Sequence, residues 1–183
     1  MSKIQNNGKP SVFYSSTLKS PVGSALFPAI AEPDSYKGGE PFYKVTLIFE
    51  EDSDQWAEIK GVFTDFAKTY SKEIGKTVTA DSVLKTDTRS GKPCITFKSK
   101  ARQGDNGNFL PMVCVDGTKA ATDAPQNGDQ VCVAYTLGGW SSAFGSGIKP
   151  YLSAVQVISR RPAFSKTFAV DVFDAVSTED CPF

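Results

Sequence analysis

The chain has 183 residues, of which 40% are hydrophobic and 22% are charged, a mixture typical of one soluble globular domain with a tail. It contains no apolar stretch near the roughly 18–20 residues of a membrane-spanning helix and no signal-peptide pattern within residues 1–10, so a cytosolic protein is expected. The formal net charge is zero, but residues 169–183 hold four of the 20 acidic groups and no basic group.

The N-terminal part of the chain predicts two short strands. Residues 11–18 favour a first strand, and residues 24–31 favour a second one, in which Pro28 indicates a sheet edge or a bulge. Residues 32–40 are polar and predict a loop that turns at Gly38 and Gly39.

The clearest strand of the chain covers residues 42–50. Tyr43, Val45, Leu47 and Phe49 alternate with mostly polar residues, and β-branched and aromatic side chains dominate. This pattern predicts a half-buried strand, and we expect it to form the spine of a small β-barrel.

An amphipathic helix is predicted directly after this strand and is expected to end at Gly75, with Asp52 or Ser53 as the N-cap. Its large apolar side chains recur at helical spacing on one face, namely at Trp56, Ile59, Phe63, Phe66 and Tyr70. We interpret this stripe as core packing across the barrel rather than as a binding face.

The second half of the chain predicts strands and long connections. Residues 76–92 predict a long loop, whereas Cys94 to Lys100 alternates again, with Lys98 and Lys100 on its polar face. Further strands are expected at residues 110–115, 130–137 and 149–158. Between the last two, the glycine-rich residues 138–147 predict a flexible loop that carries Trp140 and Phe144.

The order of strands, one helix and more strands predicts a mainly β protein with the OB-fold, a five-stranded, partly open Greek-key barrel. We expect this domain to cover residues 1–164, with additional strands, and residues 165–183 to form a disordered acidic tail. Regular strand spacing alone equally allows another all-β barrel or a sandwich.

The residue types of the chain give little indication of a catalytic site or a metal site. The chain has no histidine, which excludes a His-assisted nucleophile and a His-ligated metal. Cys94, Cys114 and Cys132 lack the close spacing of zinc ligands and are expected to be reduced thiols packed on strands. Residues 139–143 lack the final Gly of a nucleophile elbow, and Ser-Gly-Lys at 90–92 lacks the rest of a phosphate loop. We therefore predict no enzyme, no metal and no cofactor.

Basic and aromatic residues alternate at several places, as single-stranded nucleic acid requires. Cations follow the phosphates while rings stack on the bases. The residues expected at phosphates are Lys44, Lys98, Lys100, Arg102 and Lys149, and those expected at bases are Tyr43, Trp140, Phe144 and Tyr151. The alternative interpretation is that each lysine is simply solvated and that each ring belongs to the core.

Residues 38–49 (GGEPFYKVTLIF), the helix after them and residues 147–157 (GIKPYLSAVQV) resemble the phage single-stranded-DNA-binding proteins of the T7 type and their relatives in other tailed phages. The resemblance covers roughly residues 20–160. The C-terminal end adds to it, because bacterial single-strand binders similarly end in an acidic run followed by Pro-Phe.

The resemblance implies a non-enzymatic protein that coats single-stranded DNA in the host cell cytoplasm during phage DNA replication, recombination or repair. It also implies that the tail competes for the DNA groove and docks partners such as a DNA polymerase or helicase. The residues implied in docking are Asp174, Glu179, Asp180, Pro182 and Phe183. A homodimer, a virion β-barrel without a nucleic-acid role and an accessory domain tethered by its tail stay open as alternatives.

Overall fold

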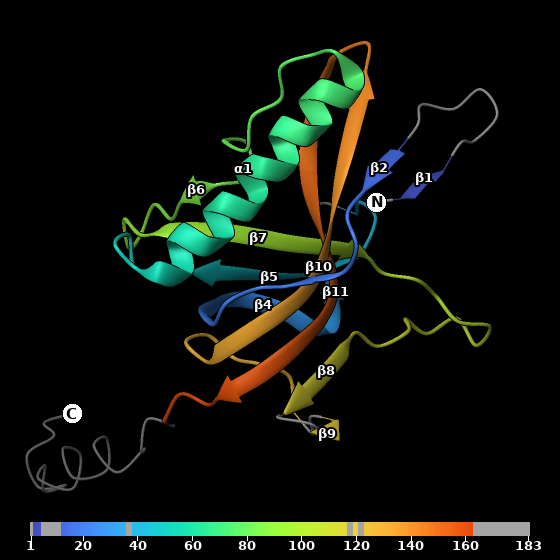
Figure 1. Ribbon diagram of the computed structural model, residues 1–183. Coiled ribbons are helices and arrows are strands. Elements are labelled where there is room, and N and C mark those ends of the chain that lie inside the picture. Colours follow the sequence, from blue (N-terminus) through green and yellow to red (C-terminus); the bar gives the residue numbers. More distant parts are fainter. Residues whose placement is uncertain (1, 5–11, 36–37, 117–118, 121–122, 163–183) are drawn as a thin grey trace, which may run out of the picture.

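The structure is a computed structural model that describes residues 2–4, 12–35, 38–116, 119–120 and 123–162 (Figure 1). Its helix is α1 (Asp54–Ile74), and its strands are β1 (Ser2–Ile4), β2 (Val12–Tyr14), β3 (Leu18–Lys19), β4 (Gly23–Asp34), β5 (Phe42–Ile48), β6 (Lys85–Thr86), β7 (Pro93–Lys100), β8 (Val113–Asp116), β9 (Lys119–Ala120), β10 (Gln130–Ser142) and β11 (Gly145–Ser159). The predicted tail, with all of its docking residues, lies outside the described residues.

Five of these strands close into a barrel. β4 pairs with β5 and β5 with β7, both antiparallel, and β7 then neighbours β11 in parallel. β11 pairs with β10 along a long antiparallel ladder, and β10 returns to β4. This closed path is that of a five-stranded OB-fold barrel, as the sequence predicted. The remaining strands are short and extend the sheet at its edges.

The spine strand and the helix form as expected. Tyr43, Val45 and Leu47 of β5 are almost completely buried, since alternation turns them into the barrel. The hydroxyl of Ser53 accepts a hydrogen bond from the Trp56 N–H, and Gly75 ends α1 in the left-handed conformation. Within the barrel's strand order, α1 falls between the second strand, β5, and the third, β7.

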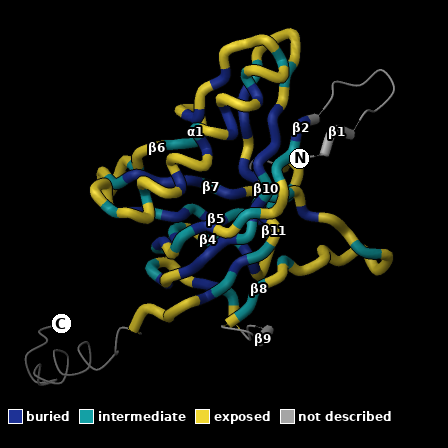
Figure 2. The backbone as a smooth tube through the Cα atoms, viewed as in Figure 1, coloured by how far each residue is buried: buried dark blue, intermediate teal, exposed yellow. Residues whose placement is uncertain are grey.

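The aromatic stripe of α1 packs into the barrel, which confirms its interpretation as core. The Phe63 ring lies 5.8 Å from that of Tyr135 and 6.4 Å from that of Phe97, measured between centroids. Figure 2 shows the buried residues gathered along the barrel strands and on the inward side of α1.

The prediction of a flexible loop at residues 138–147 is wrong. β10 continues to Ser142 and β11 begins at Gly145, so most of this segment is a regular hairpin. Its glycines serve close packing instead of mobility. A Cβ at Gly139 would lie 2.6 Å from three atoms of the Tyr70 ring, and one at Gly147 would lie 3.0 Å from Nε1 of Trp140.

Other element boundaries differ less. β4 runs on to Asp34, so the loop before β5 is shorter than expected, and β6 lies within the long connection after α1. The pairing of β4 with β5 shifts register between Leu26 and Ala29, which confirms a bulge at Pro28. Cys94, Cys114 and Cys132 are free thiols on strands, as predicted, and burial raises the pKa of each. No helix of the described chain is long and apolar enough to cross a membrane.

Candidate nucleic-acid interface

Four neighbouring strands place their polar residues on one outer face of the barrel. The strand register sets Tyr151 of β11 beside Lys98 of β7, Lys98 opposite Lys44 of β5, and Lys44 opposite Ala29 of β4. Directly paired residues share a face of the sheet, so these side chains form a row that crosses the strands. We call this row and the residues beside it the outer face.

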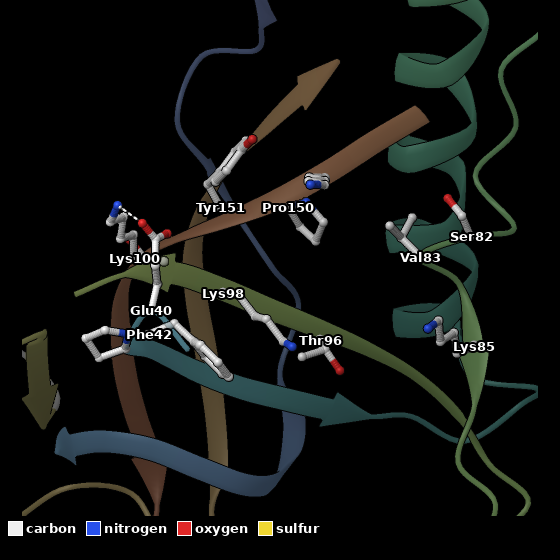
Figure 3. Close-up of a pocket in the computed structure, with 13 residues that line it drawn as sticks. Glu40, Phe42, Ser82, Val83, Lys85, Thr96, Lys98, Lys100, Pro150 and Tyr151 are labelled. Atoms are coloured by element: carbon white, nitrogen blue, oxygen red, sulfur yellow. Dashed lines mark hydrogen bonds and ion pairs between the residues drawn. The ribbon is translucent and has the colours of Figure 1, made fainter. Parts of the chain in front are cut away.

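A cleft of about 720 Å³ opens on the outer face. Residues of β5, β7, β11 and segment 82–85 line it, among them Phe42, Lys85, Thr96, Lys98, Lys100, Lys149 and Tyr151. Figure 3 shows Phe42, Lys98 and Tyr151 toward one end and Ser82, Val83 and Lys85 toward the other. The lining includes four lysines and one carboxylate, that of Glu40, so it attracts anions.

The lysines of the outer face already contact rings or carboxylates. The Lys98 Nζ lies 4.7 Å from the centroid of the Phe42 ring, and the Lys149 Nζ lies 5.5 Å from that of Trp140. Lys44 forms an ion pair with Asp34 that lowers the pKa of that carboxyl below its usual value. Lys100 forms an ion pair with the Glu40 carboxylate.

Three of the four rings predicted at bases are accessible. Trp140 is 39% exposed and Tyr151 is 37% exposed, while Phe144 is fully exposed at the turn between β10 and β11. The Tyr151 ring pairs with that of Tyr14, with centroids 6.0 Å apart, and burial together with this neighbour raises the pKa of Tyr151. Both rings lie directly over Gly138.

The prediction that the fourth ring, Tyr43, stacks on a base is wrong. Only 3% of Tyr43 is exposed, and its hydroxyl donates a hydrogen bond to the Leu110 carbonyl oxygen, so it has no free face for a base. The alternation of β5 turns Tyr43 inward and its neighbour Phe42 outward. Phe42 lies two residues before Lys44, so both side chains project from the same face of the strand. Alternation in the sequence therefore already favoured Phe42 over Tyr43 as the outward ring.

The structure does not bring every predicted residue into the cleft. Lys98, Lys100, Lys149 and Tyr151 line it, whereas Lys44, which pairs with Lys98, lies just outside the lining. Trp140 adjoins the cleft through Lys149. Arg102 is exposed in the segment that follows β7 and lies outside the lining, as does Phe144 at the hairpin turn.

The described residues contain no group of three or more His, Cys, Asp or Glu side chains that could hold a metal ion. Separately, the outer face brings lysine ammonium groups close to aromatic rings. Such an arrangement binds phosphates and stacks planar rings.

The fold and this face define an OB-fold barrel with a basic, aromatic surface. Among solved structures, the chain matches gp2.5, a single-stranded DNA binding protein encoded by bacteriophage T7, with 20% identity and a TM-score of 0.59. That match covers 92% of this chain and 98% of the T7 protein. At this identity the likeness shows the fold, and it confirms the predicted OB-fold.

A single-stranded DNA-binding protein from bacteriophage Enc34, solved in complex with ssDNA, matches with 15% identity and a TM-score of 0.60 over 81% of this chain and 89% of its own. The same Enc34 protein also matches in a second structure, with a TM-score of 0.56. The predicted resemblance to the T7 type thus holds at the level of the fold. No protein-family model and no curated protein matches the chain.

Proposed function

We propose that this chain is a single-stranded-DNA-binding protein that acts by binding and not by turnover. The observation that carries the proposal is the cleft, in which three adjacent strands bring together the Phe42 ring, the Lys98 ammonium group that contacts it, and the Tyr151 ring. The likeness of the fold to two phage proteins described as single-stranded-DNA-binding supports the proposal.

The geometry suits single strands better than duplex. Bases stack on Phe42, Tyr151 and Trp140 only when they are unpaired and turned toward the protein. Lys98, Lys100 and Lys149 neutralise the phosphates between them, without reading base edges. We therefore expect binding that tolerates any sequence and weakens steeply with salt.

The ion pairs of the free protein fit this mechanism. The carboxylates of Asp34 and Glu40 hold the ammonium groups of Lys44 and Lys100 on the outer face. Exposed ion pairs of this kind contribute little to stability, so a phosphate can replace either carboxylate at small cost. In this view the two carboxylates keep the lysines extended until DNA arrives.

We further propose that the C-terminal tail recruits partner proteins, through Asp174, Glu179, Asp180, Pro182 and Phe183. The charge distribution supports this, since the tail is acidic while the rest of the chain is basic. The proposed setting is phage DNA replication, recombination or repair in the host cell cytoplasm, with a replicative polymerase or helicase as the partner.

A gel-shift titration with matched single- and double-stranded oligonucleotides at low salt tests the proposal. We expect a saturable shift of the single strand and a much weaker shift of the duplex. A virion β-barrel without a nucleic-acid role predicts no retention of either, and that result would remove the proposed function.

A further inference from the structure

Phe27 of β4 has a backbone conformation that calls for an explanation. Its φ is +47°, and among the described residues it alone combines a positive φ with a side chain. This region is unfavourable for a bulky residue. The bulge between Leu26 and Ala29 imposes it, and the side-chain oxygen of Asn127 accepts a hydrogen bond of 2.5 Å from the Phe27 N–H.

The result of this strain is an exposed ring. Phe27 is 45% exposed, although every ring that packs in the barrel core is below 10%. The guanidinium carbon of Arg89 lies 5.0 Å from the centroid of the Phe27 ring. Arg89 comes from a tight turn in which the Asp87 carboxylate accepts hydrogen bonds from the Ser90 N–H and hydroxyl. A cation and a ring from two separate segments are thus held together at the surface.

This pair continues the outer face beyond the cleft. The row that leads from Tyr151 through Lys98 to Lys44 reaches β4 at Ala29, next to the bulge. Phe27 and Lys44 share the lining of a second hollow of about 470 Å³, together with Asp34 and Asn127. Lys44 also lies 5.8 Å from the Phe42 ring of the first cleft, so it connects the two.

We propose that Phe27 and Arg89 form a further subsite for single-stranded DNA, at the end of the outer face beyond Lys44. The Phe27 ring stacks one nucleobase, and Arg89 neutralises the adjoining phosphate. The inference rests on the proposed function, and it extends the DNA path across four strands. The strained bulge turns outward a ring that regular pairing would not place there.

The test is Phe27→Gly, measured by fluorescence anisotropy on labelled oligo-dT of about 6 and about 16 nucleotides, the range of site sizes found for OB-folds. Glycine adopts a positive φ without strain, so this variant keeps or raises the melting temperature. We expect affinity for the longer oligonucleotide to fall at least about fivefold, the lower end of what one base stack contributes, with a smaller loss on the shorter one. Ile158→Ala, which removes an equally exposed apolar side chain outside both hollows, serves as the control and leaves affinity unchanged.

A second variant, Arg89→Gln, addresses the phosphate. It should reduce the slope of log affinity against log salt by about 0.7, the value for one phosphate on a single strand, whereas Phe27→Gly leaves the slope unchanged. The subsite is contradicted if Phe27→Gly binds the longer oligonucleotide with wild-type affinity, or if Arg89→Gln leaves the slope unchanged. Either result leaves the proposed function standing. If the wild-type protein binds no single-stranded DNA at low salt, the proposed function and the subsite both fail.

Discussion

The Trp140 ring is accessible to solvent and is also held in place by neighbouring residues. Its indole lies over Gly147, where an added Cβ would be 3.0 Å from Nε1, and Lys149 lies above the ring. Glycine thus lets an aromatic ring lie flat on the neighbouring strand. The ring is fixed in place while 39% of the residue stays exposed.

We predict that Trp140→Ala weakens single-stranded DNA binding by about 1–3 kcal/mol, the contribution of one stacked base, with little change in melting temperature. Fluorescence titration checks this in a Trp56→Phe background, where Trp140 is the remaining tryptophan and its emission should be quenched by oligonucleotide. A variant that melts several degrees lower yet binds normally would instead place Trp140 among the stabilising contacts.

For single residues, the sequence predicted that Lys44 and Lys98 face outward but assigned the buried Tyr43 to the surface. Alternation identifies Lys44 and Lys98 as outward, because each follows a clear apolar pattern on its own strand. The same rule, applied consistently, selects Phe42 and rejects Tyr43. The exposure of Phe27 could not be predicted from the sequence. No local pattern shows that the bulge gives Phe27 a positive φ, or that Arg89 of a distant turn lies beside its ring.

The β10–β11 hairpin is the element on which the outer face and the core meet. Its adjacent glycines face opposite ways. Gly139 faces the Tyr70 ring of α1 in the core, whereas Gly138 lies beneath the Tyr151 and Tyr14 rings at the surface. Substitutions at Gly139 are therefore expected to affect mainly stability, and substitutions at Gly138 mainly DNA binding.

We predict that Gly139→Ala lowers the free energy of unfolding by about 1–3 kcal/mol, the usual cost of overpacking, because the buried Tyr70 ring cannot move aside. Gly138→Ala should cost less stability, since Tyr151 is partly exposed and can move, but it should weaken DNA binding by displacing that ring. Urea unfolding and anisotropy titrations on both variants check this. Equal effects on stability would show that the two glycines do not divide the hairpin in this way.

The hairpin is also the element that the sequence predicted wrongly, as a flexible loop. A run rich in glycine is typical of a flexible loop, but glycine equally permits close approach of a neighbouring ring. Only the positions of Tyr70, Tyr151 and Trp140 decide between the two. In contrast, α1 was predictable to within two residues, because its cap, its stripe and its glycine stop are all local signals.

Over the whole molecule, charge divides the chain into a basic body and an acidic end. Arg160 and Arg161, just before the tail, bind the buried carboxylate of Asp129: the Arg161 N–H donates to it at 2.8 Å and the Arg160 guanidinium at 3.3 Å. These contacts hold the last described residues of the chain against the barrel. A tethered acidic segment has a high effective concentration near the body. Under the proposed function we therefore expect the tail to compete with DNA phosphates.

We predict that removing residues 172–183 tightens single-stranded DNA binding, most visibly at about 20–50 mM salt, where screening is weak. Removing Phe183 alone takes away no acidic side chain, so it should leave DNA affinity unchanged and weaken partner docking. Anisotropy titrations of both truncations at low salt make the comparison. If the longer truncation leaves affinity unchanged, the tail does not compete for the outer face.

The barrel itself was predictable only as a class. Strand and helix order favoured the OB-fold, but closure depends on the parallel contact of Tyr151 with Lys98 and on the return of β10 to β4, which link distant segments. Local periodicity contains no information on such pairings. The same pairings assemble the outer face. Alternation along single strands therefore predicted that Lys44 and Lys98 face outward, but not that they lie in one row with Tyr151.

The salt dependence of binding tests the central claim most directly, that the outer face holds DNA phosphates. Replacing Lys44, Lys98 and Lys100 together by Ala should reduce the slope of log affinity against log salt by about 2, at roughly 0.7 per phosphate on a single strand. A control that replaces the exposed Lys60, Lys68 and Lys72 of α1 removes the same charge and should leave the slope near that of the wild type. An unchanged slope in the first variant, or an equal reduction in both, would contradict the account.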